Sequence, residues 1–487
     1  FVEKPFDVSH QEIAYNDYDK QLLLPHKLSQ TGPASAKADI NNDGLEDLFI
    51  GGAHQQEAKL LIANKDGTFA AIDVPAFSED KQYEDVSAVF FDADNDGDLD
   101  LYVVSGSYEF SENSELLQDR LYINDGQNNF KRSDSLIPSI TSAGSVVVAS
   151  DFDGDGDTDL FVGSRVIPGK YPYAPSNYLL INDNGNFTNQ ISTIAPEAEY
   201  SGMITDAHWA DMDNDNNLDL ILTGEWMGIE VFLNKNNKLV QDKAYKDLSD
   251  AKGWWNKIWI EDVNNDGKKD IIAGNLGLNY KFKASKEKPF HIYTNDFDDN
   301  GVEDIILAKH YKSKQVPVRG KSCTSQQMPY LKDKIKTYDE FANSDLKGIL
   351  GEGIESSLHY QAIEFASGLF LNDANGKFTF HPFPLKAQIA PINSIVYKDF
   401  DSDGIKDLVL AGNNYHSEVE TTRADAGIGS FLKGVGKGNF TPVSNSEIGF
   451  YANSDVRNIE CFENENTYQL IIINNNDTHK MYEISKK

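Results

Sequence analysis

The sequence predicts an all-β protein, a β-propeller of seven or eight four-stranded blades. A nine-residue acidic motif recurs seven times in the 487 residues, and short apolar runs flank its copies. Hairpin turns such as Asn-Gly and Asp-Gly follow in many of the units. The first five copies begin at Asp39, Asp92, Asp151, Asp211 and Asp262, a spacing of roughly 50 to 60 residues. Such a period is typical of propellers, whose blades bury their faces against one another.

The acidic motif itself is clearest in "SDFDGDGDTDLFVG", residues 150–163, where aspartates occupy every second position from 151 to 159. Calcium takes six to eight oxygen ligands, and a short loop with alternate acidic residues and a glycine at its turn can supply them. Side chains at positions 1, 3, 5 and 9 and the backbone carbonyl at position 7 would form the cage. A solvated acidic turn is the alternative for one copy, but seven copies favour up to seven Ca²⁺ sites.

The candidate calcium ligands are positions 1, 3, 5, 7 and 9 of each copy. They are Asp39, Asn41, Asp43, Leu45 and Asp47; Asp92, Asp94, Asp96, Asp98 and Asp100; Asp151, Asp153, Asp155, Asp157 and Asp159; Asp211, Asp213, Asp215, Asn217 and Asp219; Asp262, Asn264, Asp266, Lys268 and Asp270; Asp296, Asp298, Asn300, Val302 and Asp304; and Asp399, Asp401, Asp403, Ile405 and Asp407. The fourth copy carries Asn216 where the other six copies have glycine, so we expect its site to be weak or empty.

Each repeat also carries a strand pattern around its loop. An apolar run such as "SVVVASDF" precedes the loop, and a second such as "DLFVGS" follows it. Further short runs, as in "YLLINDNGNFTN", turn at Asn-Gly or a similar pair. One unit is therefore strand, loop, strand, strand, hairpin and strand, which makes one four-stranded blade of a single propeller domain over 1–487.

The region between the fifth and seventh motifs breaks the repeat. Within 328–363, Leu331, Ile335, Tyr338 and Phe341 recur at helical spacing, so we predict a helical insertion over 319–363. The insertion either forms a binding surface or seals the blades. Seven blades result if the motifs at Asp262 and Asp296 share one blade, and eight if each begins its own.

The two ends of the chain are expected to close the ring. Residues 455–487 contain apolar runs but no acidic loop, so we predict the strands of a terminal blade there. An N-terminal segment, 1–32, would close the ring through a strand near 10–25, which removes exposed sheet edges.

These repeats resemble the FG-GAP/VCBS repeats of integrin α-subunit heads and of many secreted bacterial proteins. The segments 22–33, 274–285, 384–413 and 455–462 resemble the C-terminal half of ASPIC/UnbV proteins of Bacteroidota, which are related to cartilage acidic protein. The resemblance implies a calcium-binding module on the cell surface. Its partner would be a surface protein, such as a TonB-dependent transporter complex of the outer membrane, or a glycan.

Charge excludes some partner classes. The chain has 77 acidic and 44 basic residues, a formal net charge of −33, and about thirty of the acids lie in the seven loops. This balance argues against nucleic acid and against anionic membranes as partners, and no run of residues is long and apolar enough to span a membrane. Lysines cluster at 281–288 and 309–314, either as a local polyanion-binding patch or as solvated loops.

Cysteine content and the chain start bear on localisation. Cys323 and Cys461 allow one disulfide or none. Few cysteines together with weak calcium loops fit a protein exported by a bacterium to the extracellular or outer-membrane surface. The chain begins at "FVEKPF" without a signal peptide, so we expect a mature or truncated piece of a longer protein.

No catalytic and no cofactor-binding residue is predicted, since the ten histidines form no metal-ligand motif and no nucleophile elbow occurs. His-Tyr pairs at 310–311 and 359–360 are weak support for a lyase, and Trp226, Trp254 and Trp255 either stack on sugars or belong to the core. We therefore favour a non-catalytic recognition or adhesion module. The alternative is a lyase-type polysaccharide-active enzyme or a glycan-binding propeller. A dense group of His, Tyr and Arg in one cleft would favour the enzyme, and a flat face rimmed by loops the binder.

Overall fold

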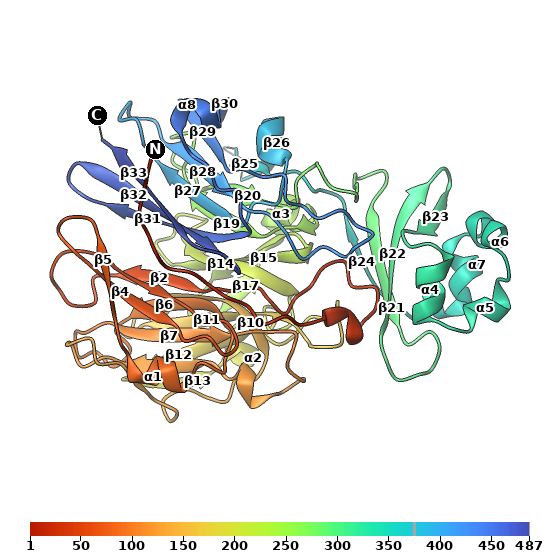
Figure 1. Cartoon of the computed structure of the whole chain (residues 1–487), viewed down its shortest axis with the longest axis horizontal. Helices are drawn as coiled ribbons and strands as arrows, with labels where there is room; N and C mark the ends of the chain where they lie inside the picture. The colour runs from red at the N-terminus through yellow and green to blue at the C-terminus, as the bar shows by residue number, and fades with distance from the viewer. Residues whose placement is uncertain (374–375, 487) are drawn as a thin grey trace.

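The computed structural model describes residues 1–373 and 376–486, so residue 487 of the predicted terminal segment lies outside it. The chain is built almost entirely of antiparallel four-stranded sheets, and the predicted all-β propeller fold is confirmed (Figure 1). In the apolar runs after the acidic loops nearly every residue is buried, because these second strands are covered on both faces by neighbouring sheets.

The first four sheets keep their strands in chain order. They are β2 (Ser35–Ala38), β3 (Asp47–Ile50), β4 (Lys59–Ala63) and β5 (Phe69–Ile72); β6 (Asp85–Phe91), β7 (Asp100–Ser105), β8 (Arg120–Ile123) and β9 (Lys131–Arg132); β10 (Ala143–Ser150), β11 (Asp159–Val166), β12 (Tyr178–Asp183) and β13 (Asn186–Asn189); and β14 (Met203–Ala210), β15 (Asp219–Met227), β16 (Ile229–Asn234) and β17 (Leu239–Gln241), with β18 (Gly253–Trp254) paired to β15.

Three further sheets continue the series. They are β19 (Lys257–Glu261), β20 (Asp270–Gly274), β25 (Gly368–Asn372) and β26 (Phe378–Pro382); β27 (Ser394–Lys398), β28 (Asp407–Ala411), β29 (Ser430–Gly436) and β30 (Asn439–Val443); and β31 (Val456–Glu463), β32 (Thr467–Asn474), β33 (Lys480–Ser485) and β1 (Val2–Lys4).

The first strands of these seven sheets contact one another in a closed series, β2, β6, β10, β14, β19, β27, β31 and back to β2. The arrangement is a ring of seven sheets around a common axis, consistent with a seven-bladed propeller. Strand β1 pairs with β33 and completes the last sheet from the other end of the chain. The expected closing strand near 10–25 is wrong in position. Leu23 and Leu24 from that segment are instead buried in the core cluster at one end of the ring.

The eighth sheet is inserted between β20 and β25, the second and third strands of the fifth ring sheet. It consists of β21 (Phe290–Asn295), β22 (Asp304–Tyr311), β23 (Lys314–Pro317) and β24 (Leu358–Ala362). The acidic loop at Asp262 therefore belongs to the ring and the loop at Asp296 to the inserted sheet. In Figure 1 this sheet projects from one side of the ring.

The predicted helical insertion contains several short helices where the sequence pattern suggested one regular helical repeat. These are α4 (Lys321–Gln327), α5 (Leu331–Lys334), α6 (Tyr338–Asn343), α7 (Leu346–Leu350) and the 3₁₀ turn η4 (Gly351–Ile354). Leu331, Ile335 and Phe341 are buried against the inserted sheet as the spacing predicted. Tyr338 is 69% exposed, because helix α5 ends at Lys334 and a new helix, capped by Thr337, begins at Tyr338 in a different orientation of the helical pattern.

The remaining helices are single turns in the connections between strands. They are α1 (Pro75–Glu79), α2 (Ile191–Ile194), α3 (Lys246–Ser249), α8 (Asn445–Ile448), η1 (Asp17–Asp19), η2 (Glu115–Leu117), η3 (Lys243–Tyr245) and η5 (Leu385–Gln388). Among the described residues, no helix has the length and apolar character needed to cross a membrane.

Candidate functional site

The seven acidic loops share one backbone turn. Each loop joins the first and second strands of a sheet, and the carboxylate at position 1 accepts the N–H of position 6. Asp151 accepts from Gly156 at 3.1 Å, and Asp211 accepts from Asn216 at 2.9 Å. Position 6 has positive φ, which glycine adopts freely and asparagine tolerates, so Asn216 (φ 67°) keeps the turn of the fourth loop intact.

The aspartate at position 9 fastens each ring loop to its sheet. Asp219 accepts the Met212 N–H at 2.8 Å with one oxygen and the Asn234 N–H of the third strand at 2.8 Å with the other. Position 9 is fully buried in the six ring loops, and burial raises the pKa of Asp159 to about 7 and that of Asp219 to about 6. These aspartates therefore join loop to strand whether or not a cation binds.

Several loop oxygens are buried without a hydrogen-bond donor among the described residues. They are Asp92 Oδ1, Asp94 Oδ1, Asp159 Oδ2, Asn264 Oδ1, Asp298 Oδ1 and Asp401 Oδ1. Five loops also bring three carboxylates within 4.8 Å of one another: Asp92, Asp94 and Asp96; Asp151, Asp153 and Asp159; Asp211, Asp213 and Asp219; Asp296, Asp298 and Asp304; and Asp399, Asp401 and Asp407. The loops at Asp39 and Asp262 carry asparagine at position 3 instead. Buried oxygens without donors are costly, and a hard cation would satisfy them, so these residues fit Ca²⁺.

Two loops already hold a lysine ammonium among their carboxylates. Lys235 Nζ lies 2.5 Å from Asp213 and 3.0 Å from Asp215 in the fourth loop. Lys433 contacts Asp401 and lies 2.9 Å from Asp403 in the seventh. Weak calcium binding by the fourth loop stays a prediction. The structure suggests a different physical reason for it, which is the Lys235 ammonium among the carboxylates rather than Asn216. The carbonyl ligands at position 7 also stay predictions; the Asp157 side chain there accepts the Asn184 N–H at 2.8 Å.

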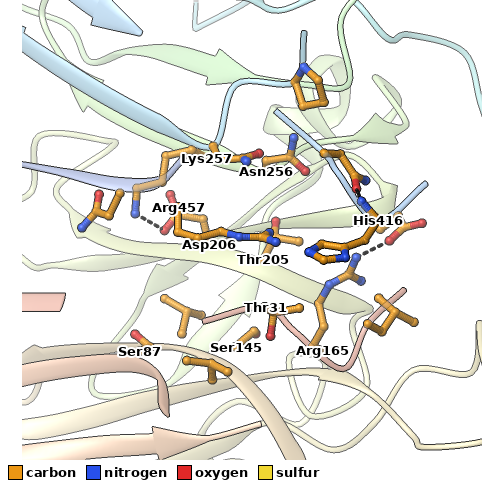
Figure 2. Close-up of a pocket in the computed structure, with 18 of the residues that line it drawn as sticks. Thr31, Ser87, Ser145, Arg165, Thr205, Asp206, Asn256, Lys257, His416 and Arg457 are labelled. Atoms are coloured by element: carbon orange, nitrogen blue, oxygen red, sulfur yellow. Dashed lines mark hydrogen bonds and ion pairs between the residues drawn. The ribbon is translucent and has the colours of Figure 1, made fainter. Parts of the chain in front are cut away.

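A cavity of about 240 Å³ lies among the first strands of the ring (Figure 2). Each of the seven ring sheets contributes a polar residue from the first three positions of its first strand or from the position just before it. These residues are Ser35, Ser87, Ser145, Thr205, Lys257, Asn393 and Asn458. The N-terminal segment adds His26, Lys27 and Thr31, and the loop after β28 adds Asn413, Asn414 and His416.

Three buried carboxylates around this cavity are each paired with cationic or imidazole groups. Glu225 contacts Arg165 and the Tyr171 hydroxyl, and lies 3.4 Å from His26. Asp206 lies 2.8 Å from Lys257 Nζ and 3.4 Å from His208. Burial alone would raise both pKa values, but the adjacent Arg165 and Lys257 hold the pKa of Glu225 and that of Asp206 at about 2.

The third carboxylate, Asp455, lies 3.0 Å from Arg457 and 3.3 Å from His416. In Figure 2 the side chains of Arg165, His416 and Arg457 extend toward the middle of the cavity from different parts of the chain.

Four nitrogen atoms that line the cavity are buried without a hydrogen-bond partner among the described residues. They are Trp254 Nε1, His26 Nδ1, Arg165 Nη1 and Arg457 Nε. Trp254 is 3% exposed and His26 is 8% exposed, so bulk solvent does not readily hydrogen-bond to these two side chains. Indole and guanidinium N–H groups can only donate, so the cavity fits a ligand rich in acceptor oxygens.

The cavity is neither the cleft dense in His, Tyr and Arg that would favour an enzyme nor the flat, loop-rimmed face that would favour a binder. It collects His26, His416, Arg165 and Arg457 in one hollow, so the face is not flat. Tyr171, however, is fully buried behind Glu225, and Trp226 Nε1 donates to its hydroxyl at 2.7 Å. No tyrosine lines the cavity among the described residues.

The three tryptophans considered for sugar stacking belong to the core. Trp226 and Trp254 are 3% exposed and Trp255 is fully buried, because their rings pack in aromatic clusters with Phe290 and Phe370. Only Trp254 also borders the cavity. The cavity is not predicted by any motif, although a serine, threonine or asparagine near the start of many of the first apolar runs is a signal of it in the sequence.

The lysine clusters and the two His-Tyr pairs lie around the inserted sheet. Lys281, Lys283 and Lys288 line one cavity of about 330 Å³ together with Lys309 and His310. His310 and His359 both contact His291, and burial together with these two imidazoles lowers the pKa of His291 to about 4. Cys323 and Cys461 are free thiols, so no disulfide joins them.

Comparison with known proteins identifies the repeats. The FG-GAP-like repeat model matches residues 39–103, 109–162 and 211–273. No curated protein matches the chain.

Similar solved structures share little sequence with the chain. They include the V. cholerae biofilm matrix protein Bap1 (11% identity, 100% of this chain and 91% of that chain, TM-score 0.40) and Saccharomyces cerevisiae Sqt1 (11%, 95% and 98%, 0.43). YCF48 bound to D1 peptide is a third (10%, 98% and 100%, 0.41). Three segments of this chain, which hold five of the seven acidic loops, are therefore FG-GAP-like repeats.

Proposed function

We propose that the chain is a non-catalytic, calcium-binding recognition module of the extracellular or outer-membrane surface, which binds a carboxylated glycan unit in the central cavity. The observation that carries the proposal is the set of four buried nitrogen atoms without partners on residues that line the cavity. A ligand carboxylate and its neighbouring hydroxyls would accept from these donors, and buried donors without acceptors are costly to leave.

The charge of the cavity supports an anionic ligand. Its lining side chains include four cations, Lys27, Arg165, Lys257 and Arg457, but two carboxylates, Asp206 and Glu225. Asp455 lies against Arg457, and when it is included the cavity still has four cationic side chains against three carboxylates. The whole chain, by contrast, has a formal net charge of −33. A local excess of cationic groups in an acidic chain favours an anionic ligand at this cavity.

The size and the hydroxyl lining support a sugar. A volume of about 240 Å³ corresponds to about eight water molecules at liquid density, which is room for one sugar ring with its substituents. The Ser145 and Thr205 hydroxyls donate to backbone carbonyls, so their oxygens can accept from sugar hydroxyls, and the Ser87 hydroxyl, which accepts the Val147 N–H, can donate to one.

Calcium would hold the loops that join the first two strands of each ring sheet. One site saturated 100-fold contributes about 2.7 kcal/mol to folding, so several sites together would strongly favour the closed ring. Loops of this kind fit an exported protein, because extracellular calcium modules bind with dissociation constants of about 10⁻⁴ to 10⁻³ M. As an accessory of an outer-membrane uptake complex, such as a TonB-dependent transporter, the module would present glycan ends to it.

Calorimetric titration with glucuronate, galacturonate and neutral glucose tests the ligand class. We expect the two uronates to bind and glucose to bind at least tenfold more weakly. Arg457→Gln should weaken uronate binding about tenfold or more, since a charge-assisted hydrogen bond contributes about 1.5–3 kcal/mol. Lys437→Gln, on an exposed hairpin turn, is the matched charge control and should change nothing. Equal binding of glucose, or unchanged binding by Arg457→Gln, would contradict the proposal.

A lyase is the second candidate, because His26 and His416 lie beside Arg165 and Arg457 on the same cavity. An arginine neutralises a uronate carboxylate and an imidazole removes the adjacent proton in such a reaction. The test is the ultraviolet absorbance of an unsaturated uronate product on incubation with polyuronates, and its appearance would replace the binder with the enzyme.

A further inference from the structure

The inserted sheet borders a second cavity, of about 330 Å³, which shares no lining residue with the central cavity in the described part of the chain. Phe290 on β21, Lys309 on β22 and Val318, which follows β23, line it from the sheet. The segment 281–288, which leads from the ring to β21, supplies most of the remaining lining. We call this hollow the lysine cavity, because four lysines line it: Lys281, Lys283, Lys288 and Lys309.

The apolar part of the lining belongs to the hydrophobic core. The rings of Phe282 and Phe290 stack with 4.6 Å between their centroids, and both pack against Trp254. Phe282 is 3% exposed and Phe290 1%, so the core holds this part of the lining in place. The half-buried Ala284 and Val318 pack against the same core and add aliphatic surface. An apolar group of a ligand would therefore leave water for a preformed apolar surface.

The four lysines give the cavity a positive charge that no lining carboxylate balances. There is no aspartate or glutamate among the described lining residues, and none of these lysines forms an ion pair within the part of the chain that the structure describes. The Lys281 ammonium donates to the Glu420 carbonyl and the Lys283 ammonium to the Leu278 carbonyl, which are neutral acceptors. An ammonium carries three N–H donors, so both lysines keep donors for a ligand.

The acids nearest in their effect on Lys281 are engaged by another cation. Glu418 and Glu420 act electrostatically on Lys281, but both of their carboxylates contact Arg319. The lysine cavity is therefore a local concentration of cationic groups in a chain whose formal net charge is −33. Such a site favours an anionic ligand.

We propose that the lysine cavity binds an amphiphilic carboxylate, a single carboxylate on an alkyl chain of about eight carbons, as in a medium-chain fatty acid. The alkyl chain would bury against Phe282, Phe290 and Val318, and the carboxylate would accept from the ammonium groups of Lys288 and Lys309. Lysine suits this role, because its ammonium is a compact charge with three rotatable donors. The inference depends neither on calcium nor on the ligand of the central cavity.

The size and the charge of the cavity favour this ligand over a polyanion. An apolar cavity of about 150 Å³ accommodates benzene, so about 330 Å³ has room for an alkyl chain with its carboxylate. A sulfated polymer would extend past the four lysines onto the rest of an acidic chain and would be repelled there. A single carboxylate with an apolar body needs only the cavity.

Calorimetric titration of the calcium-saturated protein with octanoate, octan-1-ol and butyrate tests the two halves of the ligand separately. We expect one octanoate to bind per chain. Octanol lacks the charge and butyrate lacks half of the alkyl chain, so each should bind at least tenfold more weakly. Tryptophan fluorescence should change when octanoate binds, because Trp254 packs on Phe282.

The variants separate the charge of the cavity from its volume. Lys288→Gln combined with Lys309→Gln should weaken octanoate binding at least tenfold, and both residues are exposed, so this variant should fold. Ala284→Leu, which fills the cavity without a change of charge, should weaken binding as well. Lys332→Gln combined with Lys336→Gln, at exposed positions of the helical insertion outside the cavity lining, is the matched control and should leave binding unchanged. Circular dichroism checks the fold of each variant.

Failure of the wild-type chain to bind octanoate would overturn the proposal. Octanol binding as tight as octanoate binding, or full octanoate binding by the Lys288 and Lys309 double variant, would overturn it as well. Competition by glucuronate would place octanoate in the central cavity instead. Salt-sensitive binding of dextran sulfate without binding of octanoate would overturn the proposal in favour of a polyanion surface.

Discussion

The third and fourth acidic loops, 151–159 and 211–219, lie on neighbouring sheets and have the same turn but differ in what their carboxylates meet. In the third loop, burial together with the adjacent Asp155 and Asp151 raises the pKa of Asp153. In the fourth, the Asn217 N–H and the Lys235 ammonium lower the pKa of Asp215. Asp159 Oδ2 lacks a donor among the described residues, whereas Lys235 bridges Asp213 and Asp215.

The repeat therefore encodes two separable properties, the backbone turn and the electrostatic environment of its carboxylates. The position-9 aspartate and the turn at position 6 build the same corner in both loops, independent of any ion. We expect the affinity for a cation to depend on a residue outside the motif, since Lys235 comes from the β16–β17 turn, sixteen residues after Asp219 in the chain. A loop with its own ammonium needs calcium less and should bind it more weakly.

The largest effect should come from removing the position-9 aspartate. Asp159→Ala leaves the buried Asn182 N–H without its acceptor, and Asp219→Ala leaves the Met212 and Asn234 N–H groups without theirs, at about 1–3 kcal/mol for each group. In chelator we therefore expect Asp219→Ala to lose more stability than Asp159→Ala, measured by urea unfolding. With excess calcium, Asp159→Ala should lose more than Asp219→Ala, because it also removes a ligand of the stronger site. The same order of losses under both conditions would show that calcium does not distinguish the loops.

The second effect is a pH dependence that calcium reverses. Burial raises the pKa of Asp159 to about 7 and that of Asp219 to about 6, above the unfolded value of about 4. An acid with a raised folded pKa is stabilising below its unfolded pKa, and this contribution is lost as pH rises through the folded value.

In chelator we therefore expect stability to fall between about pH 4 and pH 7, measured by urea unfolding at each pH. With calcium it should rise over the same range, since calcium binds the ionised form. The Asp159→Asn variant should flatten the chelator profile, and an unchanged profile would contradict the assignment of the titration to this residue.

The smallest effect on stability should come from Lys235→Met. The Lys235 side chain is 44% exposed, and exposed ion pairs contribute about 0–1 kcal/mol to stability. Its effect on calcium should be larger, because removing a cation from the loop favours a divalent ion by Coulomb attraction of about 1 kcal/mol or more. We expect about tenfold tighter calcium binding at the fourth loop by calorimetry. The matched change of a lysine on the β29–β30 turn of another sheet, Lys437→Met, should alter neither stability nor calcium binding at the fourth loop.

Much of the fold could be predicted from the repeats, because each motif fixes a corner between two apolar strands. The count of ring sheets could not, since it depends on whether the motif at Asp296 belongs to the ring or to an inserted sheet. Strand β1 has three residues, too few to give a pattern, so the closing segment was misplaced. The interruption between helices α5 and α6, at residues 335–337, likewise could not be predicted from the spacing of Tyr338 and Phe341.

Of the two parts of the candidate site, the acidic loops could be predicted from the sequence and the central cavity could not. Side chains of the acidic loops gather where the motif places them, because all ligands of one loop lie within nine residues. The central cavity joins Arg165, His416 and Arg457, which are far apart in the chain, and a single sequence gives no spacing that brings them together. Lys235 and Lys433 were missed for the same reason, since each reaches its loop from a later hairpin.

The measurement that tests the central claim most directly is thermal unfolding with excess calcium and with chelator, followed by counting of calcium on the folded chain. We expect a large fall in melting temperature in chelator, several calcium ions per chain, and weaker binding by the fourth loop than by the third. An unchanged melting temperature and a folded chain without calcium would contradict it, and the loops would then be acidic turns held by their own hydrogen bonds.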